Sequence, residues 1–243
     1  MFQTAINNYL NTHHYERIEL KTVLFDMDGV LFDSMKGHAI AWHESMKQYG
    51  MHLEPAEAYE HEGRTGAKTI NIVSMRERGR EATEEEIKAI YQKKCDIFNS
   101  LGAAPRMPGA LEVLTKIKAS GITPVIVTGS GQTSLLEKLN NNFPGIFDPQ
   151  LMVTAFDVKY GKPNPEPYLI GLKKAKVQPN EAIVVENAPL GVRAGVAAGI
   201  FTIAVNTGPL PDEALLKEGA NLLFHSMNDF NSNWDTFYKA LQE

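Results

Sequence analysis

The sequence lacks several features that would place it in a specialised class of protein. It has one cysteine, Cys95, in 243 residues, so no disulfide can form within the chain. The 24 basic residues are outnumbered by 29 acidic ones, and the formal net charge of -5 excludes the broad positive field of a nucleic-acid-binding protein. No apolar run is long enough to span a membrane. We therefore expect a cytoplasmic protein without nucleic-acid or membrane partners.

The hydrophobic residues that are present, 43% of the chain, suffice for a large core. Buried strands are predicted at residues 21–25, 123–127, 182–185 and 201–205, and a further strand-like run lies at 151–154. Helical patterns separate these runs. Such alternation is typical of parallel βα units, so the predicted fold class is α/β.

The region between the first two predicted strands is different, because it is helical throughout with no convincing strand. Pro105 and Pro108 mark the return to the alternating pattern. We therefore expect a Rossmann-like catalytic core built from residues 1–35 and 105–243, with an inserted helical cap domain of residues 36–104. A short amino-terminal helix is expected to dock on the core.

Polar clusters follow four of the predicted strands. They are Asp26 with Asp28, Thr128 with Gly129 and Ser130, Lys162, and Glu186 with Asn187. The carboxyl ends of parallel strands meet at one edge of a sheet, so these side chains should converge. Together they offer a nucleophile, an acid and base, phosphate donors, a cation and metal ligands, which is the set that phosphoryl transfer needs.

Each cluster also has an ordinary structural explanation. Asp26 beside a glycine turn fits a turn-forming residue. Thr128 and Ser130 fit a capped turn whose backbone amides, from Gly129 to Gln132, could also cradle a phosphate at a helix start. Lys162 fits a surface lysine in a proline-rich turn. The clusters alone therefore leave both interpretations open.

A family resemblance favours the catalytic interpretation. Residues 23–34, VLFDMDGVLFDS, resemble the first motif of the haloacid dehalogenase superfamily. Thr128 fits the second motif, residues 161–167 (GKPNPEP) resemble the third, and residues 184–187 (VVEN) occupy the fourth. Within the first motif, Asp33-Ser34 is expected to cap the following helix.

The resemblance implies a magnesium-dependent phosphohydrolase that works through an aspartyl-phosphate. Asp26 would be the nucleophile, because a carboxylate forms an acyl phosphate that water can cleave. Asp28 would act as general acid and base and bind Mg²⁺ through its backbone carbonyl. Thr128 would bind the phosphate, and Lys162 would neutralise the phosphate and the nucleophile.

The fourth motif departs from the family, which usually places an acidic metal ligand where this chain has Asn187. An amide oxygen can bind a hard cation such as Mg²⁺ but adds no charge. Glu62 is a candidate for the missing charge, because it lies on a glycine-flanked loop that corresponds to the substrate-specificity loop of the family. The alternative is that Glu62 is an exposed loop residue.

The resemblance narrows to the β-phosphoglucomutase-like group, which has a site histidine at the position of His38, although His38 could simply lie on the first cap helix. Glu62 and Asn187 together resemble a group member that works as an inorganic pyrophosphatase. The predicted reaction is therefore hydrolysis of inorganic pyrophosphate, by a monomer. The candidates for holding the second phosphate are Lys68, Arg64 and Lys36.

Two alternatives stay open. A sugar-phosphate phosphatase or a β-phosphoglucomutase would use the same core residues on another small phosphorylated substrate. A non-catalytic phosphate-binding protein is a more remote alternative, because Asp26, Asp28 and Lys162 are all present. A dehalogenase has no use for Asp28 or a metal motif.

Overall fold

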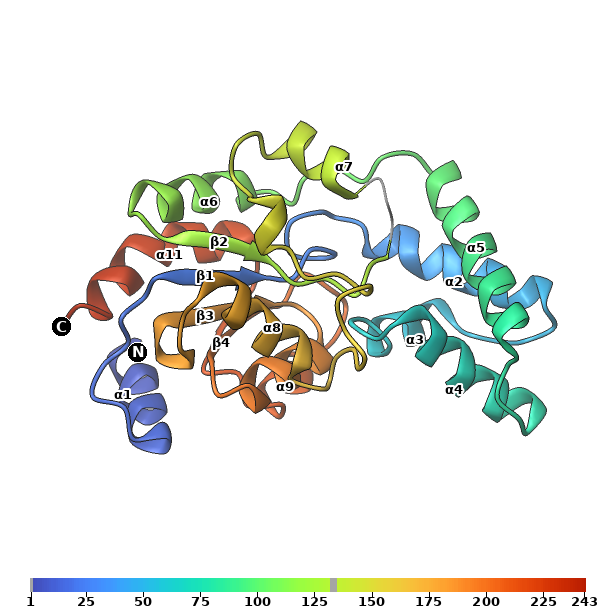
Figure 1. The fold of residues 1–243 in the computed structure, drawn as a ribbon, viewed down its shortest axis with the longest axis horizontal. Helices are drawn as coiled ribbons and strands as arrows, with labels where there is room; N and C mark the ends of the chain where they lie inside the picture. The colour runs from blue at the N-terminus through green and yellow to red at the C-terminus, as the bar shows by residue number, and fades with distance from the viewer. Residues whose placement is uncertain (1, 132–134) are drawn as a thin grey trace.

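The computed structural model describes residues 2–131 and 135–243, and at its centre lies a five-stranded parallel sheet (Figure 1). The strand order is β2-β1-β3-β4-β5. The strands are β1 (Thr22–Phe25), β2 (Thr123–Ile126), β3 (Ala182–Glu186), β4 (Phe201–Val205) and β5 (Leu222–Phe224). The predicted α/β fold is confirmed.

Helices cover both faces of this sheet. One face packs against α1 (Phe2–His13), α6 (Ala110–Ala119) and α11 (Met227–Ala240), and the other against α8 (Glu166–Ala175) and α9 (Pro189–Ala197). Neighbouring residues of one strand reach opposite faces, because side chains alternate along a strand: Phe25 packs in the first core and Leu24 in the second. The remaining helices are α7 (Leu135–Asn142), α10 (Asp212–Leu216) and two 3₁₀ turns, η1 (Pro149–Leu151) and η2 (Pro179–Glu181).

The position of each strand agrees with its residues. Every residue of β1 is buried, as expected for a central parallel strand covered on both faces. Pro124 lies in β2, which pairs with β1 alone and forms one edge of the sheet. An edge position tolerates proline, because the missing backbone N–H can face away from the ladder.

The strand order also fixes where a ligand can bind. From β1 the chain passes to β2 on one side and later returns to β3 on the other, so the connections diverge at β1 and β3. In open α/β sheets, ligands bind at such a switch point, outside the carboxyl ends of the strands. Asp26 follows β1 directly, and Glu186 ends β3.

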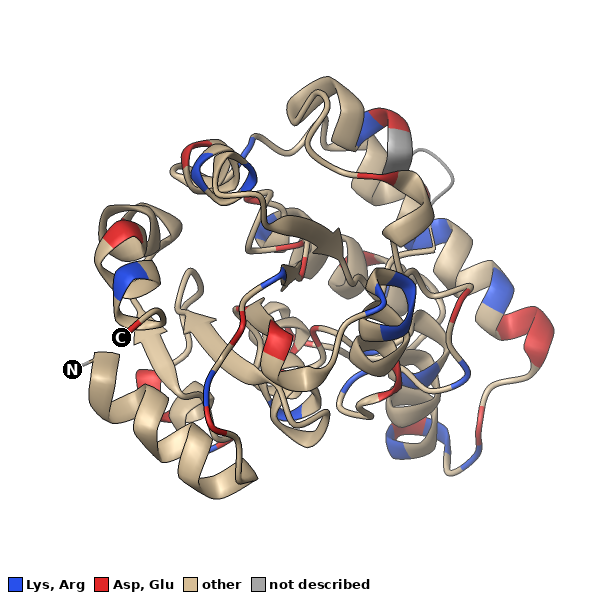
Figure 2. Cartoon of the chain, turned by 60° about the vertical axis from the view of Figure 1, so that its left-hand side comes forward, with Lys and Arg blue, Asp and Glu red and all other residues tan. Residues whose placement is uncertain are grey.

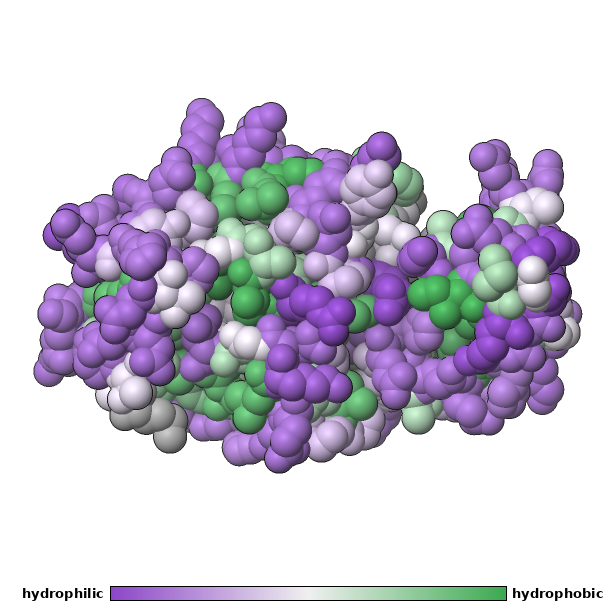
Figure 3. Space-filling model, turned by 90° about the horizontal axis from the view of Figure 1, so that it is seen from below, coloured by the Kyte–Doolittle hydropathy of each residue, from purple (hydrophilic) through white to green (hydrophobic). Residues whose placement is uncertain are grey.

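Between β1 and α6 the chain forms the expected helical insertion, which we call the cap. Its helices are α2 (Met35–Gln48), α3 (Pro55–Glu60), α4 (Gly66–Arg78) and α5 (Glu84–Ser100). They enclose a hydrophobic cluster separate from those of the sheet, with Met46, Ile70 and Ile90 at its centre. Core and cap form two lobes in the space-filling view (Figure 3). The exact boundaries at residues 36 and 104 stay a prediction.

The structure corrects two expectations. Residues 151–154 do not form a strand: η1 ends at Leu151, and Val153 makes a single isolated bridge to Val127. Conversely, β5 was not predicted, because its three residues are too short to give a periodic signal.

The distribution of charge and the character of the helices bear on which partners the protein could bind. Acidic and basic residues are interspersed over core and cap (Figure 2) rather than gathered into one basic face. Among the residues that the structure describes, no helix has the length and apolar character needed to cross a bilayer.

Candidate active site

Asp26 and Asp28 lie in a tight turn at the end of β1. The side chain of Asp26 is buried, and its Oδ1 accepts a hydrogen bond from Lys162 Nζ at 2.5 Å. The turn depends on Gly29, whose φ of +81° is in the left-handed region. A Cβ atom at Gly29 would also stand 2.0 Å from Asn187 Nδ2, so only glycine lets Asn187 approach this turn.

Lys162 links three strand ends. Its ammonium donates to Asp26 Oδ1 at 2.5 Å, Glu186 Oε1 at 2.5 Å and the carbonyl of Val127 at 3.0 Å. Burial alone would lower the pKa of Lys162, but the two carboxylates outweigh burial and raise it. The lysine is therefore a fixed cation beside the proposed nucleophile.

Glu186 has a structural part in this network that the sequence did not reveal. Its Oε1 also accepts from the Tyr168 hydroxyl at 2.7 Å, and its Oε2 accepts from the backbone amides of Asn187 and Ala188 at 3.0 and 3.2 Å. The carboxylate is fully buried and already accepts four hydrogen bonds. Its place in the structure is to hold Lys162.

Asp28 is held by groups from the start of the cap. Its Oδ1 accepts from Ser34 Oγ at 2.6 Å and lies 3.1 Å from His38 Nε2. Burial would raise the pKa of Asp28, but His38 and Ser34 together hold it below its ordinary value. The expectation that Ser34 caps the next helix needs correction, since Ser34 stands at the N-cap of α2 but its hydroxyl makes no capping bond and binds Asp28.

Thr128, Gly129 and Ser130 follow β2 and line the same pocket. The Thr128 hydroxyl accepts a hydrogen bond from the backbone amide of Ser130 at 3.1 Å, which fixes the turn. Gly129 lies under the cap: a Cβ atom there would stand 3.2 Å from the carbonyl of Gly63. The predicted cradle of amides extends to Gln132, which lies outside the described residues.

The cap brings Glu62 to the core. Glu62 Oε1 accepts a hydrogen bond from Asn187 Nδ2 at 2.8 Å, so the two residues singled out in the sequence do meet. Burial and the nearby Asp26 carboxylate raise the pKa of Glu62 well above its ordinary value. Burial likewise raises the pKa of Asp26, and Glu186 and Asp28 add to this rise against the opposing effect of Lys162.

These groups fit a divalent cation. Asn187 Oδ1 is buried and has no hydrogen-bond partner among residues 2–131 and 135–243. An orphaned carbonyl oxygen is costly to bury, and a hard cation would satisfy it. Within the same residues no cluster of three or more His, Cys, Asp or Glu side chains is placed to bind a metal. A magnesium ion would therefore use Asn187 Oδ1 and backbone oxygen together with Asp26.

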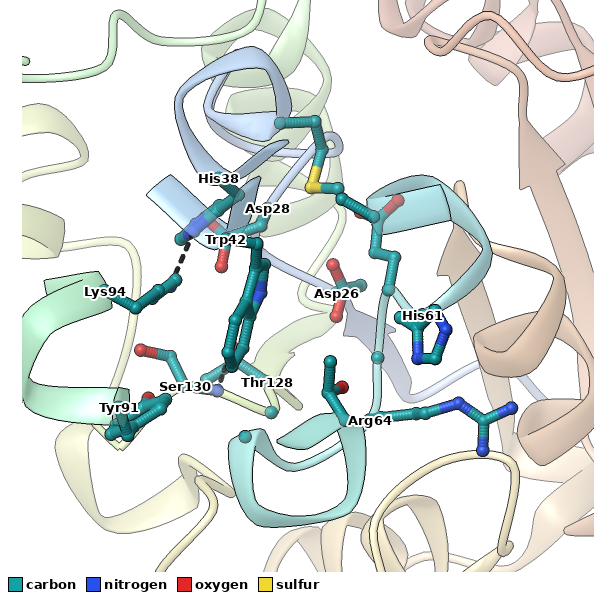
Figure 4. Close-up of a pocket in the computed structure, with 17 residues that line it drawn as sticks. Asp26, Asp28, His38, Trp42, His61, Arg64, Tyr91, Lys94, Thr128 and Ser130 are labelled. Carbon is teal, nitrogen blue, oxygen red and sulfur yellow. Dashed lines mark hydrogen bonds and ion pairs between the residues drawn. The ribbon is translucent and has the colours of Figure 1, made fainter. Parts of the chain in front are cut away.

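The pocket lies between core and cap (Figure 4). From the core it is lined by Asp26, Asp28 and the Thr128 turn. From the cap it is lined by His38, Trp42, His61, Glu62, Arg64, Tyr91 and Lys94. Lys68, expected at the substrate, is instead exposed on α4 and outside the lining, and Lys36 is exposed beside a neighbouring cavity. Of the three predicted cations, only Arg64 reaches the pocket.

Comparison with known proteins agrees with this geometry. Residues 20–199 match the hydrolase family described as haloacid dehalogenase-like hydrolase. The chain belongs to the haloacid dehalogenase-like hydrolases.

The names of similar proteins include two phosphatases and one candidate β-phosphoglucomutase. Hexitol phosphatase A of Escherichia coli is 32% identical over 208 residues, which are 85% of this chain and 91% of that protein. The phosphorylated carbohydrates phosphatase of Thermotoga maritima is 31% identical over 209 residues, 83% and 92% of the two chains. A solved structure of a candidate β-phosphoglucomutase from Bacteroides vulgatus has 71% identity and a TM-score of 0.97, covering 100% of this chain and 98% of that one.

Lys94 is a pocket residue of the cap that lies outside the four sequence motifs, and the sequence did not reveal it. Lys94 lies in the region that the sequence predicts to be helical, but nothing local distinguishes a buried lysine from a solvated one. In the structure Lys94 is only 4% exposed, and its Nζ lies 2.8 Å from His38 Nδ1. Its position depends on the packing of α5 against α2, which brings the two side chains together.

Proposed function

We propose that this haloacid dehalogenase-like hydrolase is a magnesium-dependent phosphohydrolase whose substrate is inorganic pyrophosphate. Because Lys162 holds Oδ1 of Asp26, the nucleophile would attack phosphorus with Oδ2. The bond from phosphorus to the leaving phosphate breaks as the Asp26 phosphoryl bond forms, and the phosphate leaves as an anion, so Asp28 need not give up a proton in this step.

The second half of the reaction regenerates the enzyme. Asp28 takes a proton from water, the water oxygen attacks phosphorus, and the bond to Asp26 breaks to release phosphate. His38 and Ser34, which hold Asp28 ionised, suit it to this base role. Magnesium, bound by Asp26, the Asp28 backbone, Asn187 Oδ1 and Glu62, would neutralise charge on the transferred phosphoryl group.

The observation that carries the choice of pyrophosphate is the hydrogen bond between Glu62 and Asn187. This bond places the carboxyl group of Glu62, from the cap, beside Asn187, the neutral metal-ligand candidate of the core. With magnesium bound, Glu62 would supply one oxygen ligand and Asn187 another, and the cation would offset the charge of pyrophosphate. Phosphate is also a better leaving group than a sugar alkoxide, so it places less demand on Asp28 as an acid.

Sugar phosphates are the second candidate, and the names of the relatives favour them over pyrophosphate. The two phosphatases described above act on hexitol phosphate and phosphorylated carbohydrates by name, and the solved structure described above is of a candidate β-phosphoglucomutase. Trp42 and Tyr91 line the cap side of the pocket, and aromatic rings offer the apolar faces on which sugar rings pack.

Steady-state kinetics on the purified protein separate the two candidates. Specificity constants would be measured for pyrophosphate, hexitol phosphates, glucose 6-phosphate and β-glucose 1-phosphate, each with magnesium and with a chelator. The proposal expects pyrophosphate to have the highest constant and all activity to need magnesium. A higher constant for any sugar phosphate, or conversion of β-glucose 1-phosphate to glucose 6-phosphate, would favour the second candidate.

A further inference from the structure

Lys94 is a buried cation without an acidic partner. It projects from α5 into the pocket between core and cap, and only 4% of the residue is exposed. Among the described residues its Nζ makes one hydrogen bond, to His38 Nδ1 at 2.8 Å, and no ion pair. Buried charges are normally paired, because an unpaired one costs several kcal/mol of desolvation.

The surroundings of Lys94 compensate this cost only in part. The Nζ atom lies over three aromatic rings, at 5.5 Å from the centre of Trp42, 5.8 Å from Tyr91 and 5.2 Å from Phe98. Such cation–π contacts stabilise an ammonium but do not use its N–H groups. An ammonium has three donors, and His38 takes one. The pocket therefore holds a cation with unused donors.

The contact with His38 has a definite direction. An ammonium can only donate, so His38 Nδ1 must accept from Lys94. Nε2 then carries the proton and donates to Asp28 Oδ1 at 3.1 Å. Orienting His38 in this way requires a donor but not a full charge. Orienting His38 therefore does not explain why the group at this position carries a positive charge.

We propose that Lys94 binds the second anionic group of the substrate, the phosphoryl group that leaves, and so selects substrates with charge on both sides of the scissile bond. The inference rests on the proposed phosphohydrolase function and specifies its substrate class. The anion would provide the counter-charge that the protein lacks at Lys94. Arg64, whose buried Nε has no partner among the described residues, lines the same pocket and could assist.

A binding experiment tests this without depending on the chemical step. Calorimetry would measure the affinities of methylenediphosphonate and of inorganic phosphate, in the presence of magnesium, for the wild-type protein and four variants. Lys94→Met removes the charge and Lys94→Arg keeps it. His38→Leu breaks the link to Asp28 but keeps the cation, and Lys68→Met removes an exposed lysine of the same cap.

The wild type should bind the diphosphonate more tightly than phosphate. Lys94→Met should reduce this ratio of affinities by about tenfold or more, the value of one charge-assisted hydrogen bond. Lys94→Arg should retain most of the ratio, and His38→Leu and Lys68→Met should leave it unaltered. Thermal melts of each variant verify that it is folded, and Lys94→Gln replaces Lys94→Met if the latter is not.

Three results would overturn the proposal, and they differ in what else they affect. A preference for the diphosphonate that persists in Lys94→Met refutes the role of Lys94 and leaves the pyrophosphatase assignment intact. A wild type that binds both ligands equally refutes both. A ratio that falls equally in His38→Leu and Lys94→Met would show that Lys94 acts only by positioning His38.

Discussion

The cap residue Glu62 accepts a hydrogen bond from the side-chain amide of the core residue Asn187, with 2.8 Å between Oε1 and Nδ2. Asn187 can make this contact and still present to a cation its Oδ1, which has no hydrogen-bond partner in the described part of the chain. An aspartate at this position could do only the second, because it has no donor and would face the Glu62 carboxylate with like charge. The asparagine therefore suits a site that gains a carboxylate from its cap.

This relationship predicts how two substitutions interact. Asn187→Asp should tighten magnesium binding by adding charge, while repelling Glu62 and lowering turnover. Glu62→Gln should weaken magnesium binding. In the double variant, the new cap amide could donate to the new core carboxylate and restore the contact, so activity should exceed that of Asn187→Asp alone by about tenfold. Magnesium titrations and kcat for the four proteins measure this; strictly additive effects would show that the two residues act independently.

Asp26→Asn should reduce turnover by at least about a thousandfold, because the amide keeps the shape of the side chain and loses the nucleophile. Lys162 keeps its bond to Glu186 in this variant, so the fold should persist. Steady-state assays with a circular-dichroism melt as control test the assignment. Turnover within about tenfold of the wild type would exclude Asp26 as the nucleophile.

Glu186→Gln should destabilise the protein through its effect on Lys162. The NH₂ group of the glutamine would face groups that can only donate, such as the Lys162 ammonium or a backbone amide. These buried donors would lose their acceptor, at a cost of about 3 kcal/mol or more. Tyr168→Phe is a matched control, because it removes one of the four hydrogen bonds to Glu186 and should cost about 1 kcal/mol. Urea unfolding measures both. Equal losses in the two variants would contradict the anchoring role of Glu186.

The raised pKa of Glu62 predicts a dependence of stability on pH in the metal-free protein. The folded state holds this proton more tightly than the unfolded state, so the stabilisation is fully present below the ordinary carboxyl pKa of about 4.3 and is lost as the pH rises toward the folded-state value. Glu62→Gln removes this loss. We expect the variant to melt higher than the wild type at neutral pH without metal, and magnesium to stabilise the wild type more. Equal stabilisation of the wild type and Glu62→Gln by magnesium would argue against Glu62 as a ligand.

How far the sequence could predict the site depended on the range of the interactions. Asp26 and Asp28 stand at a strand end beside Gly29, and Lys162 stands in a proline-rich turn after a strand-like run; these local signals placed them on the correct edge of the sheet. The strand end also placed Glu186 at this edge but did not reveal its contact with Tyr168, and Lys94 gave no signal, because their partners come from other elements: Tyr168 lies on α8 and His38 on α2.

Errors arose where local pattern and tertiary packing disagree. Lys68 was selected as a cation of the specificity loop, but α4 begins at Gly66, with Thr65 as its N-cap, and its first turn leaves Lys68 exposed. The run at 151–154 has strand-like residues, yet η1 occupies its start and only Val153 reaches a neighbouring strand residue. The N-cap at Thr65 decides the position of Lys68, and the single bridge to Val127 is the long-range contact that Val153 makes.

The central claim, covalent transfer of the phosphoryl group to Asp26, is tested most directly by rapid acid quench of the wild-type enzyme during turnover, followed by mass spectrometry of its peptides. Pyrophosphate and the best sugar phosphate would each be used with magnesium. The mechanism predicts a phosphoryl group on the peptide that contains Asp26, located on that side chain and absent from Asp26→Asn. A phosphoryl group on any other residue of the enzyme would contradict it.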